Sequence, residues 1–124
     1  MQTIVLYAGS AVLILWGIAH IAIPTRGIVK SFGAISIDNK RILLMEWIME
    51  GLLLIFIGTL VVAVTWFAGF EHSASAVVYR SASVMLAVMA SLSAFTGART
   101  SILPMKLCPP IFAAVALGYW LASL

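Results

Sequence analysis

The sequence predicts an all-α membrane protein, a bundle of four transmembrane helices. Of its 124 residues, 64% are apolar and only 9% are charged, whereas a water-soluble domain carries roughly a quarter of its residues as charged side chains. The mean hydropathy is +1.17. Most charged residues fall between four long apolar segments, each suited to crossing a hydrocarbon core of ~30 Å as a helix. We therefore expect a single transmembrane domain over residues 1–124.

The first expected helix covers residues 3–23, an apolar run that ends before Pro24, Thr25 and Arg26. A bilayer core requires ~20 residues at 1.5 Å each, and this run supplies them. No basic residue precedes the run, and no small-x-small cleavage motif follows it in a polar context. Because a signal peptide has both features, we expect a retained first helix.

Residues 24–41 form the expected first loop, because this stretch is too polar to span a bilayer. Its charged residues are mostly basic, and two glycines accompany them: Arg26, Lys30, Asp38, Lys40, Arg41, Gly27 and Gly33. We expect a basic cytoplasmic loop at the membrane surface, with a short surface helix over residues 28–35.

The second expected helix covers residues 42–67, which contain no Lys or Arg. This segment is long enough to cross with a tilt. Its only charged residues, Glu46 and Glu50, lie in its first third. The second helix is therefore acidic where it begins.

Two shorter segments complete the expected bundle. Residues 77–96 are rich in Ser and Ala, with Arg80 near the start, and small residues of this kind allow helices to approach closely in lipid. Residues 107–124 form the fourth helix. Pro109 and Pro110 fall in the expected first turn, where a missing amide donor costs no hydrogen bond.

The basic residues predict the orientation, because Lys and Arg are concentrated in cytoplasmic loops. The first and third expected loops contain all but one of them, and only Arg80 borders the second loop: Arg26, Lys30, Lys40, Arg41, Arg99 and Lys106. We expect a multi-pass protein of the plasma (inner) membrane with both termini outside the cytoplasm. The basic residues form no run, so we expect no nucleic-acid partner.

Glu46 and Glu50 are the most informative residues, because their spacing places them on one face of a helix. A charged side chain inside a span costs a few kcal/mol, so it is usually paired, protonated or bound to a ligand. His20 lies three residues before the end of the first helix, at the same expected interface, and Arg99 approaches the same layer. We therefore expect a polar cluster of His20, Glu46 and Glu50.

Trp16 and Trp47 are expected to form aromatic walls beside this cluster. Two interpretations are open. In the structural one, His20 hydrogen-bonds a neighbouring helix and Glu50 forms a salt bridge with Arg99 or Arg26. In the functional one, the cluster relays a proton or cation, or binds a ligand that carries a positive charge or a hydroxyl group.

Metal and cofactor chemistry is not expected. The single cysteine, Cys108, excludes an intramolecular disulfide and a multi-thiolate metal site. The sequence has no Glu-x-x-His pair of the kind used by di-metal carboxylate bundles. His20 and His72 are expected at opposite faces of the membrane, where they cannot share one haem.

The segment Met45-Glu46-Trp47-Ile48-Met49-Glu50-Gly51, followed by Gly58 and preceded by Gly17 and His20 in the first helix, resembles the DoxX-like group of small four-helix membrane proteins. The similarity extends to chain length, the long first loop, and an acidic residue followed by a glycine early in the second helix. The resemblance implies a four-helix membrane fold and diverse activities, among them accessory subunits of redox complexes and assembly helpers.

Three functions are consistent with these residues. The first is an accessory or ligand-binding membrane protein that associates with itself or with a larger membrane complex. The second is a proton- or cation-coupled transporter that acts through Glu50 as an oligomer, since four helices are too narrow to enclose a pore. The third is a lipid- or sterol-modifying enzyme with His20 as base and Glu46 or Glu50 as acid or as stabiliser of a cationic intermediate.

The absence of a nucleophile motif such as G-x-S-x-G favours the first, non-enzymatic function. The expected partners are membrane lipid, a second copy or a larger membrane complex, and a small apolar or cationic ligand.

Overall fold

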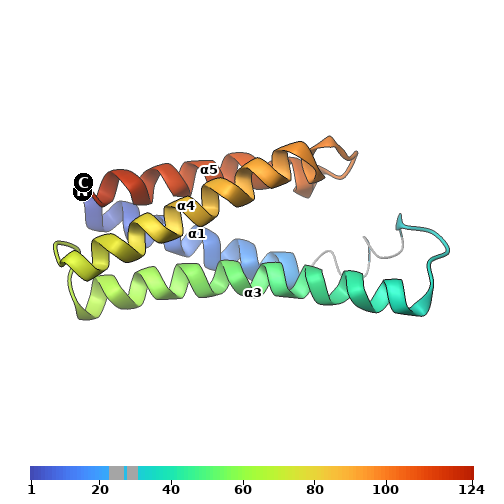
Figure 1. Ribbon diagram of the computed structural model, residues 1–124, viewed down its shortest axis with the longest axis horizontal. Helices are drawn as coiled ribbons and strands as arrows, with labels where there is room; N and C mark the ends of the chain where they lie inside the picture. The colour runs from blue at the N-terminus through green and yellow to red at the C-terminus, as the bar shows by residue number, and fades with distance from the viewer. Residues whose placement is uncertain (23–26, 28–30) are drawn as a thin grey trace. The chain divides into compact units, whose positions relative to one another are not determined.

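The structure, a computed structural model, describes residues 1–22, 27 and 31–124, and these residues contain helices and no strands (Figure 1). The long helices are α1 (Gln2–Ala22), α3 (Ile37–Phe67), α4 (Ser73–Phe95) and α5 (Leu103–Ala122), and a short 3₁₀ turn, η1 (Gly97–Arg99), follows α4. In the described part of the chain, four helices are long and apolar enough to cross a membrane. The predicted fold class, an all-α membrane protein with a four-transmembrane-helix bundle, is confirmed.

The helix α3 begins at Ile37 rather than at residue 42. Ser36 caps it, because its Oγ accepts a hydrogen bond from the backbone N–H of Asn39 at 3.1 Å, and Asp38 in the first turn favours the positive end of the helix dipole. Asp38, Lys40 and Arg41 therefore lie on a helix and not in a loop. Residues 23–26 and 28–30, which hold Arg26, Lys30 and the start of the predicted surface helix over 28–35, lie outside the described residues.

The length of α3 explains how it accommodates so many polar residues at its start. At 1.5 Å per residue, its 31 residues extend about 46 Å, more than the ~30 Å of a hydrocarbon core. A core of ~20 residues counted back from Phe67 begins near Ile48. We therefore expect Asp38 to Arg41 outside the hydrocarbon and Glu46 at its boundary.

The helix α5 begins at Leu103, earlier than expected, with Pro104 in its first turn. Pro109 and Pro110 consequently lie inside the helix, so their predicted place in the first turn is wrong. Pro104 already occupies the position where a missing amide donor is harmless. The two inner prolines leave the carbonyls of Met105 and Lys106 without the usual amide four residues later.

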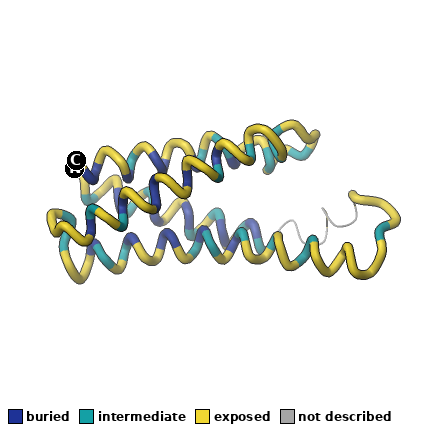
Figure 2. The backbone as a smooth tube through the Cα atoms, in the orientation of Figure 1, coloured by how far each residue is buried: buried dark blue, intermediate teal, exposed yellow. Residues whose placement is uncertain are grey.

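The chain divides into two compact units, residues 11–59 and a unit formed by residues 1–10 and 60–124. In the latter, Figure 2 shows buried positions recurring along α4 and α5 with exposed positions between them. Its largest fully buried side chains are Tyr79, Tyr119 and Phe112. The hydroxyl of Tyr119 lies 2.8 Å from Ser10 Oγ, and that of Tyr79 lies 2.8 Å from Thr65 Oγ1.

Candidate functional site

Two glycines allow α1 and α3 to approach closely in the unit of residues 11–59. A Cβ atom at Gly17 would lie 2.6 Å from the carbonyl oxygen of Gly51, and one at Gly51 would lie 2.9 Å from that of Gly17. Both distances are too short for any side chain, so only glycine fits at this crossing. His20 lies one helical turn after Gly17, and Glu50 directly precedes Gly51. The crossing therefore places both polar residues between the same two helices.

His20 is buried, with 6% of its surface exposed, and it is held against Trp47. The two rings are stacked, with centroids 4.2 Å apart and planes within 8° of parallel. The indole Nε1 of Trp47 donates a hydrogen bond to the backbone carbonyl of His20 at 2.6 Å. That carbonyl is among the last four of α1, which have no amide partner in their own helix. Trp47 thus supplies a hydrogen-bond donor to one of the free carbonyls at the end of α1, and its ring packs against the imidazole.

Glu50 is the acidic partner of this imidazole. Its Oε2 lies 3.4 Å from Nε2 of His20, and the side chains are 37% and 5% exposed, respectively. The contact is close enough for an ion pair with a protonated imidazole. Its geometry is not that of a hydrogen bond, and Nε2 of His20 has no hydrogen-bond partner among the described residues. Because buried polar atoms are almost always hydrogen-bonded, this nitrogen marks a place where a further polar atom would be stabilised.

Trp16 adds a second buried donor to the same face of α1. It lies four residues before His20, which places the two side chains on neighbouring turns. Its indole Nε1 is buried and, in the described part of the chain, has no hydrogen-bond partner. An indole N–H only donates, whereas an imidazole nitrogen donates or accepts. One face of α1 therefore presents two polar atoms that a ligand oxygen could pair with.

The remaining predicted residues have other surroundings or fall outside the description of this unit. Glu46 is exposed, one turn before Glu50 on α3. Arg99 is an exposed residue of the other unit, where its guanidinium carbon lies 5.7 Å from the centre of the Phe95 ring. Arg26, the other proposed salt-bridge partner, is outside the described residues. The structure thus brings together His20, Trp47 and Glu50, with Trp16 on the adjoining turn.

The chemistry available here is that of one imidazole and one carboxylate. Within the described residues, no group of three or more His, Cys, Asp or Glu side chains is close enough to hold a metal ion. A paired imidazole and carboxylate can share a proton, accept a hydroxyl group or face a cation. The site is therefore suited to binding a proton or a small polar headgroup.

The fold and this cluster define a small multi-pass integral membrane protein in which a buried histidine of α1 lies against a partly exposed glutamate of α3. No protein-family model, curated protein or solved structure matches the chain. The resemblance to the DoxX-like group accordingly stays a prediction that depends on the short segment around Glu46 and Gly51.

Proposed function

We propose that this protein is a membrane ligand-binding module whose site is formed by His20, Trp47 and Glu50, and whose ligand carries a hydroxyl group or a positive charge on an apolar body. The observation that supports it best is the buried Nε2 of His20. That atom lies 3.4 Å from a carboxylate oxygen and lacks a hydrogen-bond partner within the described residues. A polar ligand atom bound between the two side chains would satisfy both.

The position of the pair on the two helices favours a ligand that arrives from the bilayer. His20 lies two residues before the end of α1, and Glu50 lies about 3 Å beyond Ile48, where the hydrocarbon core is expected to begin. The polar end of an amphiphile occupies this depth in a membrane. Glu50 is partly exposed, which leaves one side of the carboxylate open to such a headgroup.

We further propose that the pair lies at the cytoplasmic side of the plasma (inner) membrane, with both termini outside the cytoplasm. Lys40 and Arg41 stand at the start of α3, and Arg99 and Lys106 flank the connection between α4 and α5. The connection between α3 and α4 contains no Lys or Arg. This asymmetry supports the orientation, because basic residues are retained on the cytoplasmic side.

Tryptophan fluorescence provides a direct test, since Trp47 contacts the proposed ligand site. In a background with Trp66→Phe and Trp120→Phe, the indoles of Trp16 and Trp47 remain. The purified protein in nanodiscs is titrated with dodecyltrimethylammonium and, separately, with dodecanol. We expect a saturable change in emission, and Glu50→Gln should weaken binding of the cation by about tenfold or more, as the loss of a charge-assisted contact predicts.

Glu46→Gln is the matched control, because it removes the same charge one turn away on an exposed face. It should leave both titrations unchanged. His20→Phe keeps a ring against Trp47 but removes the nitrogens, and it should weaken binding of the alcohol. Equal behaviour of the Glu46→Gln and Glu50→Gln proteins would contradict the proposal.

The second candidate is a proton- or cation-coupled transporter that acts as an oligomer through Glu50. It is favoured by the same pair, because a partly exposed carboxylate 3.4 Å from an imidazole can exchange a proton with it. The two functions differ in one readout, which is pH-driven uptake of the cation by the wild type and its loss in Glu50→Gln. A transporter loses pH-driven uptake of the cation into proteoliposomes, whereas a binding module shows no uptake even in the wild type.

A further inference from the structure

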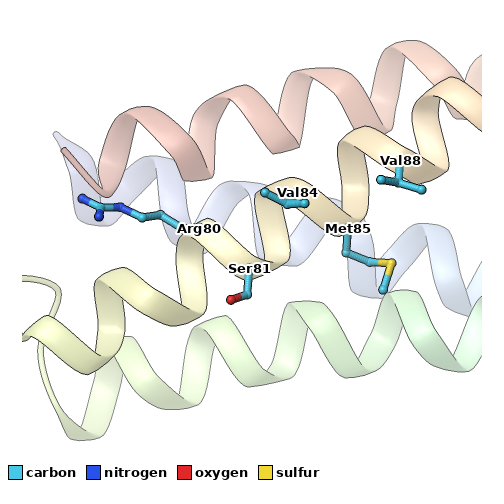
Figure 3. A pocket seen from close by; sticks show the side chains of 5 residues that line it. All are labelled: Arg80, Ser81, Val84, Met85 and Val88. Carbon is cyan, nitrogen blue, oxygen red and sulfur yellow. The ribbon is translucent and has the colours of Figure 1, made fainter.

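An exposed face of α4 carries a shallow, open cavity that is apolar except at one end (Figure 3). Its volume is about 480 Å³, and its lining residues are Arg80, Ser81, Val84, Met85 and Val88. All five are exposed. Their spacing follows one side of a helix, with the charged and hydroxyl side chains on the first turn and the apolar ones on the next two. The cavity therefore has a polar end and an apolar end along the helix axis.

The guanidinium of Arg80 is fixed at the polar end by Ser123. Its Nε donates a hydrogen bond to Ser123 Oγ at 3.3 Å, and one Nη donates to the Ser123 carbonyl at 2.9 Å. Ser123 caps the C-terminus of α5, where the helix dipole favours a positive charge. Two of the five guanidinium N–H groups are used in this way. Among the described residues no carboxylate forms an ion pair with Arg80.

The two ends of the cavity match the two layers of a bilayer leaflet. Arg80 lies at the level at which α5 ends, since it contacts the residue directly after that helix. With 20 residues, α5 is only just long enough to cross the hydrocarbon, so its end lies close to the polar headgroups. From Arg80 to Val88 the helix rises about 12 Å, away from the end of α5. The guanidinium of Arg80 is therefore expected near headgroup depth, and Val84, Met85 and Val88 are expected at the depth of the acyl chains.

We propose that this cavity is a binding site for an anionic membrane phospholipid. The lipid phosphate contacts the free N–H groups of Arg80, and one acyl chain lies along Val84, Met85 and Val88. Charge complementarity favours this occupant, because guanidinium pairs strongly with phosphate. A second copy packed through the same face would bring another Arg80 against the first, and no acidic residue lies on this face.

Native mass spectrometry of the full chain in dodecyl maltoside tests the proposal. The protein is titrated with dioleoylphosphatidylglycerol and, separately, with dioleoylphosphatidylcholine. The wild type should bind the anionic dioleoylphosphatidylglycerol about tenfold more tightly than the zwitterionic dioleoylphosphatidylcholine, as expected for a charge-assisted contact. Arg80→Gln should remove this preference, and Arg80→Lys, which keeps the charge, should retain part of it.

Two further variants separate the headgroup contact from general effects. Arg99→Gln removes an exposed arginine of the same unit that does not line the cavity, and it should leave the preference intact. Met85→Trp fills the apolar part while Arg80 stays in place, and it should weaken binding of both lipids. Circular dichroism establishes that each variant is folded.

Three kinds of result would overturn the proposal. The first is equal binding of the two lipids by the wild type or an unchanged preference in Arg80→Gln. The second is displacement of the lipid by inorganic phosphate at equal concentration, which would assign Arg80 to a free anion. The third is a change of oligomeric state in Met85→Trp with unchanged lipid binding, which would assign the face to a second copy.

Discussion

Glu46 and Glu50 lie one helical turn apart on α3, yet their side chains have different surroundings. Glu50 is next to Gly51, where α1 approaches closely enough to bring Nε2 of His20 within 3.4 Å of the carboxylate. Glu46 is exposed, at the expected boundary of the hydrocarbon core. A carboxylate at that boundary reaches water at little cost, whereas one deeper in the span requires a partner. The same residue type is therefore a surface charge at one position and the partner of a buried histidine at the next turn.

A buried hydroxyl group, like a carboxylate inside a span, is costly without a hydrogen-bond partner, and this gives a prediction for stability. Ser10 and Tyr119 are both fully buried, and their hydroxyls are 2.8 Å apart. Ser10→Ala leaves the tyrosine hydroxyl without this partner, and we expect a loss of about 1–3 kcal/mol in the free energy of unfolding. Tyr119→Phe should cost less through the hydrogen bond, because a helical serine can turn its hydroxyl to a carbonyl one turn earlier.

The measurement is a double-mutant cycle by reversible unfolding in mixed micelles with increasing sodium dodecyl sulfate. The loss in the Ser10→Ala/Tyr119→Phe protein should be smaller than the sum of the two single losses. Ser91→Ala is the control, since that hydroxyl is exposed and bonds only its own helix. Strict additivity of the two substitutions would show that this hydrogen bond does not stabilise the fold.

Much of the candidate site could be predicted from the sequence, and the limits have a physical origin. The spacing of Glu46 and Glu50 shows that they share a helix face, and the expected helix ends place His20 at a similar depth. Periodicity does not show which side of α3 is covered by α1, so it could not place Glu50 against His20. It also could not reveal that Trp47 donates to the carbonyl of His20, because that contact depends on the angle between two helices.

At the scale of helices, the contact between α1 and α3 depends on Gly17 and Gly51. The distances at this crossing leave no room for a methyl group, because a Cβ at Gly51 would also lie 2.5 Å from Cγ1 of Ile21. Tight packing of this kind is the main source of helix association in lipid, where apolar burial gives little. These glycines were visible in the sequence beside the polar residues. Their role as a crossing was not, since a glycine in an apolar helix does not identify its neighbour.

Gly17→Leu should therefore disrupt the site without removing any of its polar groups. The added side chain forces α1 and α3 apart, and overpacking of this kind costs typically about 1–3 kcal/mol. The His20–Trp47 stack should be lost, which is measured as a change in tryptophan emission in the Trp66→Phe/Trp120→Phe background. Gly27→Ala is the control, because a Cβ there meets no atom within 4 Å among the described residues. Wild-type emission and stability in Gly17→Leu would contradict the close crossing.

The ends of the helices were harder to predict than their existence. Long apolar segments identify all four helices, because a membrane imposes both length and composition. Polar residues at the start of α3 suggested a loop, yet Ser36 and Asp38 are helix-start signals, and they extend the helix beyond the hydrocarbon. Pro109 and Pro110 suggested a first turn, which Pro104 occupies instead. Composition thus indicates where a helix crosses the membrane, and capping residues decide where it begins.

For the whole molecule, the four candidate spans of the described residues, if all cross, bring both termini to one side of the membrane. The contacts in the unit of residues 1–10 and 60–124 agree, because the start of α1 packs against the end of α5 (Figure 1). A Cβ at Gly118 would lie 3.0 Å from Cγ1 of Val5, and Ser10 pairs with Tyr119. If the side of the membrane is known for one connection between helices, the sides of the termini and of the other connections follow from it.

Cysteine labelling decides which side the termini occupy. In a Cys108→Ala background, single cysteines replace Ser73, at the start of α4, or Ser101, between η1 and α5; both serines are exposed. A membrane-impermeant maleimide should label the Ser73→Cys protein in intact cells and the Ser101→Cys protein only after permeabilisation. The reason is that Arg99 and Lys106 flank Ser101, whereas the connection near Ser73 contains Glu71 and His72 but no Lys or Arg, and basic residues are retained in the cytoplasm. The reverse labelling pattern would place both termini in the cytoplasm and would contradict the proposed orientation.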